Sequence, residues 1–542
     1  MDYDVFIIHP PAIYDFREKA TFPGPIAYTV GGSTTQFITP SIGVLSIAEY
    51  LDRHGYSVRV DNIAERMVAS RDFDVEKYIG DISARVFAIG LHWCVHSQGA
   101  IEIARLCKKL HPEAMIVLGG FTATVFHEEI VQKYEFVDAV IRGEAEKPFQ
   151  LLMKALEEKR ALGEVPSLTF RNGDGDIVSV PLMEPDADLD EFEFTRLDLL
   201  EPKRSVFTPG LLPSWTIPIA RGCTHNCVTC GGSAYSYRTH FGRKKPAFRS
   251  PEKIAEDLHK LGAQGVQLVF LCQDPRIGGK EYSSKLLKTL QKEKFNLRQL
   301  TLELFTPADE EFMQELSKIK VPVGLTISPE SGVDTVRGAH GRKYTNEGLL
   351  STIKLCQKYG IRLGTFSMLA LAKDTPETIE KTWKSWEAIV RLNMTFNAPV
   401  DYAFGPMILL DPGSLAFDLP NSYGYNLLFK DFEDYVKGMS LPSWHQWISY
   451  ETKNLDKDQI IKLMNDSLEF SINLREKAKF FSKSDADIAR FCFVEASRES
   501  IEKVNEAMTI DNEEEREKVL KSLRESLDDR LSSKMSQQDT AA

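Results

Sequence analysis

Three cysteines near the middle of the chain carry the clearest chemical signal in the sequence. Cys223, Cys227 and Cys230 are spaced C-x3-C-x2-C, and no fourth Cys or His follows at the spacing of a zinc finger. Thiolates are soft ligands that suit iron–sulfur clusters and zinc. Three thiolates on a four-iron cluster leave one iron open for chemistry. The spacing therefore favours a catalytic cluster over two alternatives, a zinc knuckle and three unrelated buried thiols.

A series of alternating strands and helices is predicted to position these cysteines. The apolar run at residues 215–220 reads as a strand that ends at the cysteine loop. Amphipathic helices then alternate with further apolar runs, and Ser250-Pro251 is typical of a helix start. This pattern predicts a partial (β/α)6 barrel, whose active groups gather at the carboxyl ends of the strands. The later strands are expected at residues 266–271, 300–305, 321–327, 361–369 and 401–410.

Polar side chains are expected at the carboxyl ends of these strands, facing the cysteine loop. Gln273 follows the second strand, and Ser328 and Glu330 follow the fourth. Glu303 lies inside an otherwise apolar strand, so it is predicted to point into the barrel. Two readings stay open for Glu303, a polar ligand to cofactor or substrate and a structural salt bridge, because an unpaired carboxylate there would be costly.

The first 159 residues show a second alternation of apolar strands and amphipathic helices. Five strands are expected, and this order predicts a doubly wound parallel sheet of the Rossmann-like class. Ligands of such sheets bind beyond the carboxyl ends of the strands. The expected strands lie at residues 5–8, 56–60, 86–90, 115–118 and 137–141, and their ends carry His9-Pro10-Pro11, His92-Trp93, Gly119-Gly120-Phe121-Thr122 and Gly143-Glu144.

Three histidines near these ends are expected to line a pocket or cap helices. These are His9, His92 and His96. His92 and His96 would chelate a metal together only if both stood on one helix. The remaining cysteines are expected to be small buried side chains, with Cys272 the one that ends a barrel strand.

Two further regions complete the expected organisation. Residues 160–212 read as a connector, with a β-hairpin around Asn172-Gly173 and an acidic stretch after it. From residue 429 the pattern turns helical, and the polar residues 532–542 are expected to be disordered. The domains predicted for this α/β chain are 1–159, 160–212, 213–428 and 429–542.

Composition limits the classes of function. The 542 residues are 43% hydrophobic and carry a net charge of −12, so a nucleic-acid surface is not expected. No signal peptide and no apolar run of membrane-spanning length is evident. Eight cysteines in so long a chain do not suggest a disulfide framework. A cytoplasmic protein is expected, and an anaerobic host would suit an exposed cluster.

The cysteine spacing after a strand resembles the radical S-adenosylmethionine (SAM) enzymes, whose loop after the first barrel strand carries it. Glu330-Ser331-Gly332, followed by Arg337, is similar to a family segment that contacts SAM. Two departures are Thr229, where the family usually has an aromatic residue, and residues 369–375, where the match to G-L-P-G-E-T is partial. The resemblance implies a 4Fe-4S cluster on the cysteines, with SAM at its open iron.

Residues 3–150 resemble the cobalamin-binding domain that precedes many radical SAM domains. The matching pieces are Pro10-Pro11, Gly43-Val44-Leu45, Val117-Leu118-Gly119-Gly120 and Arg142-Gly143-Glu144. The motif D-x-H-x-x-G, whose His binds cobalt in many such domains, is absent, which implies that no His sits on cobalt there. A domain of this fold without a cofactor is the alternative.

Together the resemblances imply a set of cofactor-binding residues. The first domain would use Pro10, Pro11, Ser41, His92, Trp93, Gly119, Gly120, Phe121, Thr122, Gly143 and Glu144 for cobalamin. The barrel would use Gln273, Glu303, Ser328, Glu330, Ser331, Arg337 and Leu369.

The resemblance spans residues 3–415 and implies a cobalamin-dependent radical SAM C-methyltransferase of the class B type. In that family a 5′-deoxyadenosyl radical removes hydrogen from an unactivated carbon, which then takes a methyl group from methylcobalamin. The expected substrate is a protein or peptide side chain, and the expected electron donor is a ferredoxin or flavodoxin. The alternatives are ring formation or carbon–carbon coupling with the same cofactors, and a non-catalytic binding protein stabilised by a metal.

Overall fold

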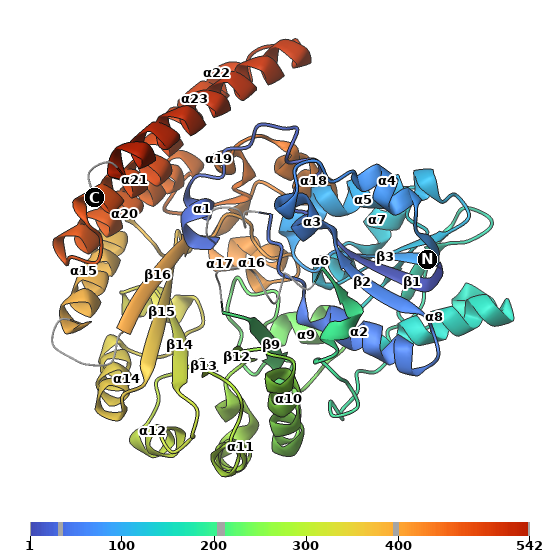
Figure 1. The fold of residues 1–542 in the computed structure, drawn as a ribbon, viewed down its shortest axis with the longest axis horizontal. Coiled ribbons are helices and arrows are strands. Elements are labelled where there is room, and N and C mark those ends of the chain that lie inside the picture. Colours follow the sequence, from blue (N-terminus) through green and yellow to red (C-terminus); the bar gives the residue numbers. More distant parts are fainter. Residues whose placement is uncertain (1, 31–35, 203–211, 394–399, 540–542) are drawn as a thin grey trace.

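A computed structural model describes residues 2–30, 36–202, 212–393 and 400–539. Figure 1 shows two open sheets side by side, with the N-terminal sheet in blue and the barrel sheet in green to orange. The C-terminal helices pack beside the barrel. The predicted α/β class, with two strand-and-helix domains and a helical end, is confirmed.

The N-terminal sheet has the order β7-β6-β5-β4-β3-β1-β2-β8. β1 pairs in parallel with both β2 and β3, so the strand order reverses beside β1. Open α/β sheets bind their ligands beyond the carboxyl ends of the strands at such a point. The parallel core consists of β1 (Asp2–His9), β2 (Val58–Asn62), β3 (Ser83–Gly90), β4 (Met115–Gly119) and β5 (Ala139–Ile141).

Helices cover both faces of this sheet because β1 is apolar on both sides. Val5 and Ile7 pack in the core that includes α2 (Ile42–Arg53) and α8 (Glu146–Glu158), whereas Phe6 and Ile8 pack in a second core with α5 (Ser97–Leu110). Ser41 stands at the N-cap of α2, although its side chain makes no capping bond.

The predicted connector contributes strands to the N-terminal sheet. The expected hairpin is present as β6 (Leu168–Arg171) and β7 (Ile177–Ser179), and it continues the sheet antiparallel to β5. At the opposite edge, β8 (Leu200–Glu201) pairs in parallel with β2. The chain therefore crosses the whole sheet before it enters the barrel. Residues 203–211 of the predicted connector lie outside the described residues.

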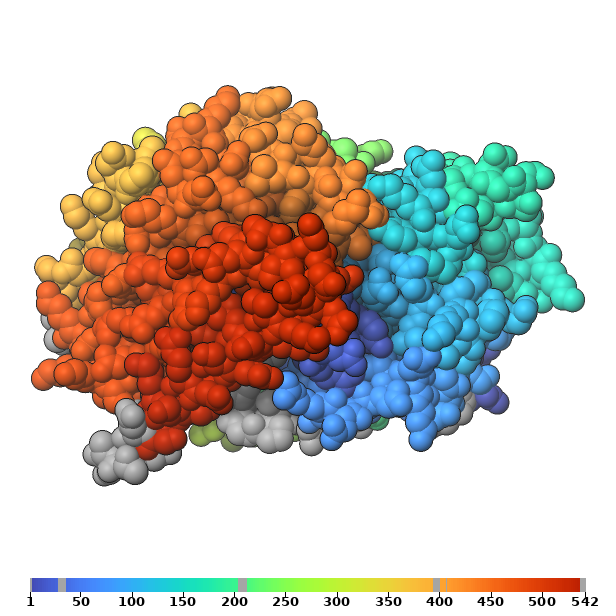
Figure 2. Space-filling view, turned by 90° about the horizontal axis from the view of Figure 1, so that it is seen from above, coloured from blue at the N-terminus to red at the C-terminus, as the bar shows by residue number. Residues whose placement is uncertain are grey.

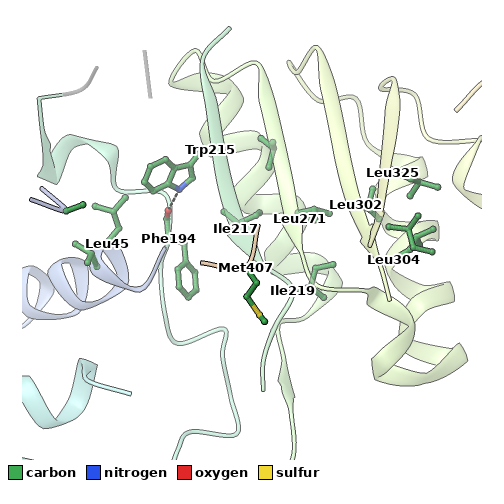
Figure 3. Close-up of a cluster of buried hydrophobic side chains, with 14 of the residues drawn as sticks. Leu45, Phe194, Trp215, Ile217, Ile219, Leu271, Leu302, Leu304, Leu325 and Met407 are labelled. Carbon is green, nitrogen blue, oxygen red and sulfur yellow. Dashed lines mark hydrogen bonds between the residues drawn. The ribbon is translucent and has the colours of Figure 1, made fainter. Parts of the chain in front are cut away.

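This crossing is packed between the two sheets. Phe192 and Phe194 are buried in the same core as Trp215 and Leu45. The indole Nε1 of Trp215 donates a hydrogen bond of 3.0 Å to the carbonyl of Phe194, as Figure 3 shows. One continuous apolar core thus joins the N-terminal sheet, the crossing segment and the barrel.

The barrel sheet has six parallel strands in the order β16-β15-β14-β13-β12-β9. Each predicted strand is present. Helix α10 (Pro251–Ala263) begins as expected, because the Ser250 side chain accepts a hydrogen bond from the Lys253 N–H. The strands are β9 (Ser214–Pro218), β12 (Leu268–Cys272), β13 (Gln299–Leu304), β14 (Val323–Glu330), β15 (Arg362–Leu369) and β16 (Val400–Pro406).

The C-terminal region differs from the prediction in two respects. It contains a small hairpin of β17 (Tyr425–Leu427) and β18 (Tyr450–Thr452) among its helices. The polar end is helical, since α23 (Glu513–Asp539) continues where disorder was expected. Leu520, Leu523 and Leu527 give that helix a buried stripe. Over the described residues, no helix has both the length and the apolar character needed to cross a bilayer.

One C-terminal helix ties the N-terminal sheet to the barrel. The Glu129 carboxylate accepts hydrogen bonds from the N–H groups of Phe432 and Glu433, which open α18 (Phe432–Ser440). The Tyr134 hydroxyl donates to Glu433 at 2.8 Å. Figure 2 shows the C-terminal helices, in red, meeting the N-terminal segment in blue. These contacts hold the two sheets in one orientation.

Candidate active site

The cysteine loop is held by hydrogen bonds to two distant segments. The Val228 N–H donates to the carbonyl of His340 at 2.9 Å, and the Gly231 N–H donates to Oδ2 of Asp411 at 2.9 Å. Gly341 lies so close to the loop that a Cβ there would be 2.6 Å from the carbonyl oxygen of Asn226. The loop is therefore shaped by the segments that follow β14 and β16.

Two backbone N–H groups point at cysteine sulfurs. The N–H of His225 donates to Sγ of Cys223 at 3.3 Å, and the N–H of Gly232 donates to Sγ of Cys230 at 3.3 Å. Such bonds to sulfur help to set the potential of an iron–sulfur cluster. Cys223, Cys227 and Cys230 are free thiols, as are the other five cysteines.

Residues with left-handed backbone stand at the carboxyl ends of three barrel strands, β12, β14 and β15. The φ angles are +84° at Gln273, +62° at Glu330 and +66° at Ala370. Residues other than glycine rarely adopt this conformation, and those that do concentrate at functional sites. All three residues lie at the barrel edge from which the cysteine loop also leaves.

Glu303 points into the barrel, as its sequence context predicts. Its Oε2 accepts a hydrogen bond of 2.9 Å from the backbone N–H of Gln273, and burial raises the pKa of Glu303. The Gln273 side chain donates to the carbonyl of Gly222 at 3.0 Å. Glu303 thus supports the strand end beside the cysteine loop, and the two roles that the sequence left open for it stay predictions.

Glu330 and Arg342 form a buried pair with unfilled hydrogen-bonding capacity. Oε1 of Glu330 lies 3.6 Å from Nε of Arg342. Among the described residues, Oε2 of Glu330 and Nε of Arg342 have no hydrogen-bond partner. Burial raises the pKa of Glu330 to about 7, although Arg342 opposes that shift. Sequence analysis did not find Arg342, because this residue belongs to no hydrophobic periodicity and to no motif.

Arg337 and Ser331 were predicted to bind a cofactor, but the structure places them in the wall of the loop after β14. The Arg337 guanidinium is fully buried and donates to the carbonyls of Pro329 and Ser331. The Ser331 hydroxyl accepts from the Val333 N–H at 3.2 Å. These side chains are bonded within the loop, and a cofactor-binding role for both stays a prediction.

Ser328 and Leu369 are at strand ends, but neither lines the cavity described below. The carbonyl of Ser328 accepts a hydrogen bond from the Tyr344 hydroxyl at 3.1 Å. The Leu369 side chain is buried in the main core. The next residue, Ala370, has its carbonyl bonded to the Tyr450 hydroxyl at 3.1 Å.

The N-terminal sheet presents an aromatic group at its carboxyl edge. The ring of His92 lies 4.9 Å from that of Trp93 and 4.6 Å from that of Phe121. Phe121 in turn contacts Phe241, with ring centroids 4.4 Å apart. Phe241 belongs to the barrel side, so this aromatic group crosses from one sheet edge to the other.

A cavity of about 690 Å³ lies between the two sheets. Its walls are the carboxyl edge of the N-terminal sheet and the faces of β9, β12 and β13. Most of the residues predicted for cobalamin line it, together with Gln273 from the barrel. The lining includes Ser41, His92, Trp93, Gly119, Gly120, Phe121, Gly143, Glu144 and Gln273.

Three residues predicted for cobalamin do not line this cavity. The side chains of Pro10 and Pro11 are buried in the segment that packs against α5, where a Cβ at Gly99 would meet the Pro11 carbonyl. The Thr122 hydroxyl donates to the carbonyl of His92 at 3.1 Å. Thr122 therefore holds the loop whose outer residues, Gly120 and Phe121, reach the cavity.

Charged residues bridge the sheets beside the cavity. Arg221, two positions before the first cysteine, pairs with Glu144 at 3.2 Å and also bonds Glu146. Arg243 pairs with Glu144 at 2.6 Å. Although burial opposes it, Arg221 and Ser46 hold the pKa of Glu146 below its ordinary value. The sequence did not indicate this bridge, which fixes the start of the cysteine loop to the N-terminal domain.

Comparisons with known proteins agree with this geometry. The family model of the B12 binding domain matches residues 28–153, and that of the Radical SAM superfamily matches residues 217–384. The chain therefore joins a B12-binding domain to a radical SAM domain. It belongs to the cobalamin-dependent radical SAM enzymes.

Relatives and a solved structure place the chain within this group. It is 24% identical to the anaerobic magnesium-protoporphyrin IX monomethyl ester cyclase of Rubrivivax gelatinosus, over 66% of this chain and 63% of the relative. It is 27% identical to the hopanoid C-3 methylase of Methylococcus capsulatus, over 46% of this chain and 44% of that protein. The chain thus spans less than two thirds of either relative.

The fold is similar to that of the cobalamin-dependent SAM radical enzyme OxsB, solved with aqua-cobalamin and SAM. The TM-score is 0.59 and the identity 12%, over 99% of this chain and 80% of that one. At this identity the likeness concerns the fold. It covers the C-terminal region as well as the two matched domains.

The residues in place fit the 4Fe-4S cluster and SAM. Free thiols stand on one loop, with N–H groups donating to two of the sulfurs. Among the described residues, no group of three Cys, His, Asp or Glu side chains is close enough together to hold a single metal ion. A four-iron cluster makes no such demand, because each thiolate binds a different iron. The unfilled groups of Glu330 and Arg342 suit the charged amino-acid end of SAM.

The N-terminal side of the cavity fits cobalamin. Gly120 has φ +118°, and a Cβ there would lie 2.6 Å from the Leu91 carbonyl, so the loop can make this turn only with glycine. Trp93 remains 39% exposed beside the cavity, which is unusual for so large an apolar side chain. Behind this edge, an apolar slot runs between the sheet and its helices, lined by Ile7, Val44, Ala88, Val117, Ile141 and Phe149.

Proposed function

We propose that this protein is a C-methyltransferase that methylates an unactivated carbon with cobalamin and SAM. The observation that carries the proposal is the cavity that the carboxyl edge of the N-terminal sheet shares with the barrel, where Arg221 and Gln273 line it beside the cysteine loop. A Cβ at Gly232, beside Cys230, would lie 3.9 Å from the ring of Phe121 in the N-terminal domain. A substrate carbon between the two cofactor sites would therefore be within reach of both.

The cofactors supply the reaction and the chain supplies placement. Bound together, they provide radical removal of hydrogen and a transferable methyl group. Cys223, Cys227 and Cys230 would hold the cluster. Glu330 and Arg342 would bind and orient the amino-acid end of SAM. The aromatic side chains of Trp93, Phe121 and Phe241 would exclude water from the space between the sites.

No general acid or base is needed in this account. The charged side chains that line the cavity are Glu144, Glu146 and Arg221, and they are bonded to one another. Because these three side chains are paired with one another, their role is to hold the two domains together. An external electron donor, such as a ferredoxin or flavodoxin, would reduce the cluster.

We infer a protein or peptide side chain as the substrate. In support, the cavity lining is largely apolar, and its one Arg is already paired with Glu144 and Glu146. A phosphorylated or carboxylated small substrate would find no unpaired cation among these lining residues. A neutral side chain would avoid the free-energy cost of burying an unpaired charge.

The test is an anaerobic reaction of the reconstituted protein with methyl-deuterated SAM and a host-cell lysate. We expect 5′-deoxyadenosine and a peptide that has gained one deuterated methyl group, and neither product with Cys223→Ala. The cyclase relative suggests the second candidate, ring formation without methyl transfer. A product that lacks the deuterated methyl group would favour that candidate and overturn the methyltransferase proposal.

A further inference from the structure

His92 occupies a fixed position at the carboxyl end of β3. Its carbonyl accepts hydrogen bonds from the Thr122 N–H at 3.2 Å and from the Thr122 hydroxyl at 3.1 Å. A Cβ at Gly120 would lie 2.7 Å from the backbone nitrogen of His92, so the two loops are in direct contact. The backbone of His92 is therefore held from the neighbouring strand end.

Whereas the backbone of His92 is hydrogen-bonded, its imidazole ring has no polar partner among the described residues. It lines the cavity between Trp93 and Phe121. Across the described residues it takes part in no hydrogen bond. By contrast, the rings of His9 and His96 both bond the carbonyl of Phe37, at 3.0 and 3.2 Å.

A histidine without a protein partner in an apolar site calls for a ligand. A neutral imidazole ring has a lone pair on one nitrogen to give. A neutral imidazole is the side chain most often found on protein-bound metals.

We propose that a ring nitrogen of His92 is the protein ligand to cobalt on the face that rests on the N-terminal sheet. This inference depends on the proposed cobalamin site. The bond is dative: the imidazole gives its lone pair, and no proton or redox change accompanies it. The missing D-x-H-x-x-G motif implied a cobalt without histidine, and His92 offers one from a different strand end.

The bond from His92 to cobalt should be weak. Ligating histidines are usually made more basic by a carboxylate on the other ring nitrogen. His92 meets no such carboxylate among the described residues. A weakly held axial ligand leaves the opposite face of cobalt, toward the cysteine loop, for the methyl group.

The test is EPR of the cob(II)alamin state in full-length protein labelled with ¹⁵N-histidine and loaded with unlabelled cobalamin. Because ¹⁵N has nuclear spin one half, we expect each cobalt line to split into a doublet. A triplet would come from the cofactor's own ¹⁴N base, and unsplit lines from an unligated or water-bound cobalt. Either of these would overturn the proposal.

A variant provides an independent reading. His92→Ala should lose the nitrogen splitting, and added imidazole should restore it. His127→Gln is the matched control, because His127 bonds Thr169 in the same domain and does not line the cavity. Splitting that survives in His92→Ala without imidazole would refute the assignment. Cobalamin retention by absorbance separates this outcome from failure of the proposed function, which predicts binding whichever group holds cobalt.

Discussion

At the scale of single residues, the barrel side of the site contains buried polar groups whose hydrogen-bonding capacity is unfilled. Glu330, Arg342 and Gln273 each have a buried polar atom without a partner among the described residues. Nearly all buried polar groups in proteins are hydrogen-bonded. A ligand bound beside the cysteine loop would give these three side chains partners.

The three loop cysteines should be individually indispensable. Cys223→Ala, Cys227→Ala and Cys230→Ala should each lose iron and abolish cleavage of SAM, because each thiolate binds a different iron. Iron content and 5′-deoxyadenosine formation measure this. Cys356→Ala is the control, since Cys356 lies on α14 (Asn346–Tyr359) and is buried in the hydrophobic core. Full SAM cleavage by any loop variant would refute the cluster assignment.

Gly120 carries a prediction for the cobalamin site. Gly120→Ala should destabilise the loop by about 1–3 kcal/mol and prevent cobalamin retention, because its φ is positive and its Cβ would meet backbone at 2.6 Å. Gly163→Ala is the control and should bind normally, since a Cβ there would have no atom within 4 Å and Gly163 does not line the cavity. The cobalt-to-protein ratio decides. Equal retention by both variants would remove this loop from the site.

His9 predicts a pH dependence of stability. Burial lowers the pKa of His9 from 6.5 to about 4, so between these values the unfolded chain binds a proton that the folded chain does not. Stability is therefore full above pH 6.5 and falls as the pH drops toward 4, by about 3 kcal/mol for this group. The neighbouring His92 and His96 act in the same direction.

The variant His9→Gln keeps a donor for the Phe37 carbonyl but removes the titration. Thermal unfolding between pH 4 and 8 should show a flatter profile for this variant than for the unmodified protein. A profile with unchanged slope would mean that His9 is not held neutral by burial.

At the scale of elements, the small β17–β18 hairpin supports the turn after β15. The Tyr450 hydroxyl donates to the Ala370 carbonyl at 3.1 Å, and the Ala372 N–H donates to the Tyr425 hydroxyl at 3.2 Å. This turn includes the left-handed Ala370 and the buried Asp374, whose Oδ2 accepts from the Leu371 N–H at 3.0 Å. A segment from the C-terminal region thus shapes a strand end of the barrel.

Tyr450→Phe tests this support. Loss of one buried hydrogen bond should cost about 1 kcal/mol, which corresponds to roughly fivefold weaker SAM binding, with iron content unchanged. Isothermal titration of the anaerobic protein measures the affinity. Tyr359→Phe is the control, because the Tyr359 hydroxyl bonds only the exposed Glu310. An unchanged affinity for SAM in Tyr450→Phe would show that the hairpin does not act on the site.

The elements could be predicted where the sequence pattern is local. Each barrel strand is a bounded apolar run, and the cysteine loop is marked by spacing alone. The helical pattern up to residue 531 was predicted, since Leu520, Leu523 and Leu527 recur at helical spacing and are buried. The last turns of α23 were missed because residues 532–539 are polar. The sequence could not show whether Arg337 or Arg342 faces the cofactor site. Their positions depend on the path of the loop after β14, and no local sequence pattern predicts that path.

At the scale of the whole molecule, the account rests on two fixed sheets with a shared cavity. The continuous core through Leu45, Phe194 and Trp215, the bridge from Arg221 to Glu144, and the docking of α18 all cross between the domains. Over residues 160–202 the segment predicted as a connector is packed, as the placement of a substrate between two cofactors would require. Crossing contacts of this kind join distant residues, so the sequence could suggest the facing edges but not the groups that hold them.

The central claim is that the cobalamin site in this cavity faces the cluster site on the cysteine loop beside it, and EPR of the fully loaded protein tests it most directly. Partial reduction should produce cob(II)alamin and the reduced cluster together, both paramagnetic. The account predicts that each signal is broadened or split by the other, and that Gly120→Ala, without cobalamin, shows the unperturbed cluster signal. Two independent signals in the loaded protein, each identical to that of one cofactor alone, would contradict this arrangement of the two sites.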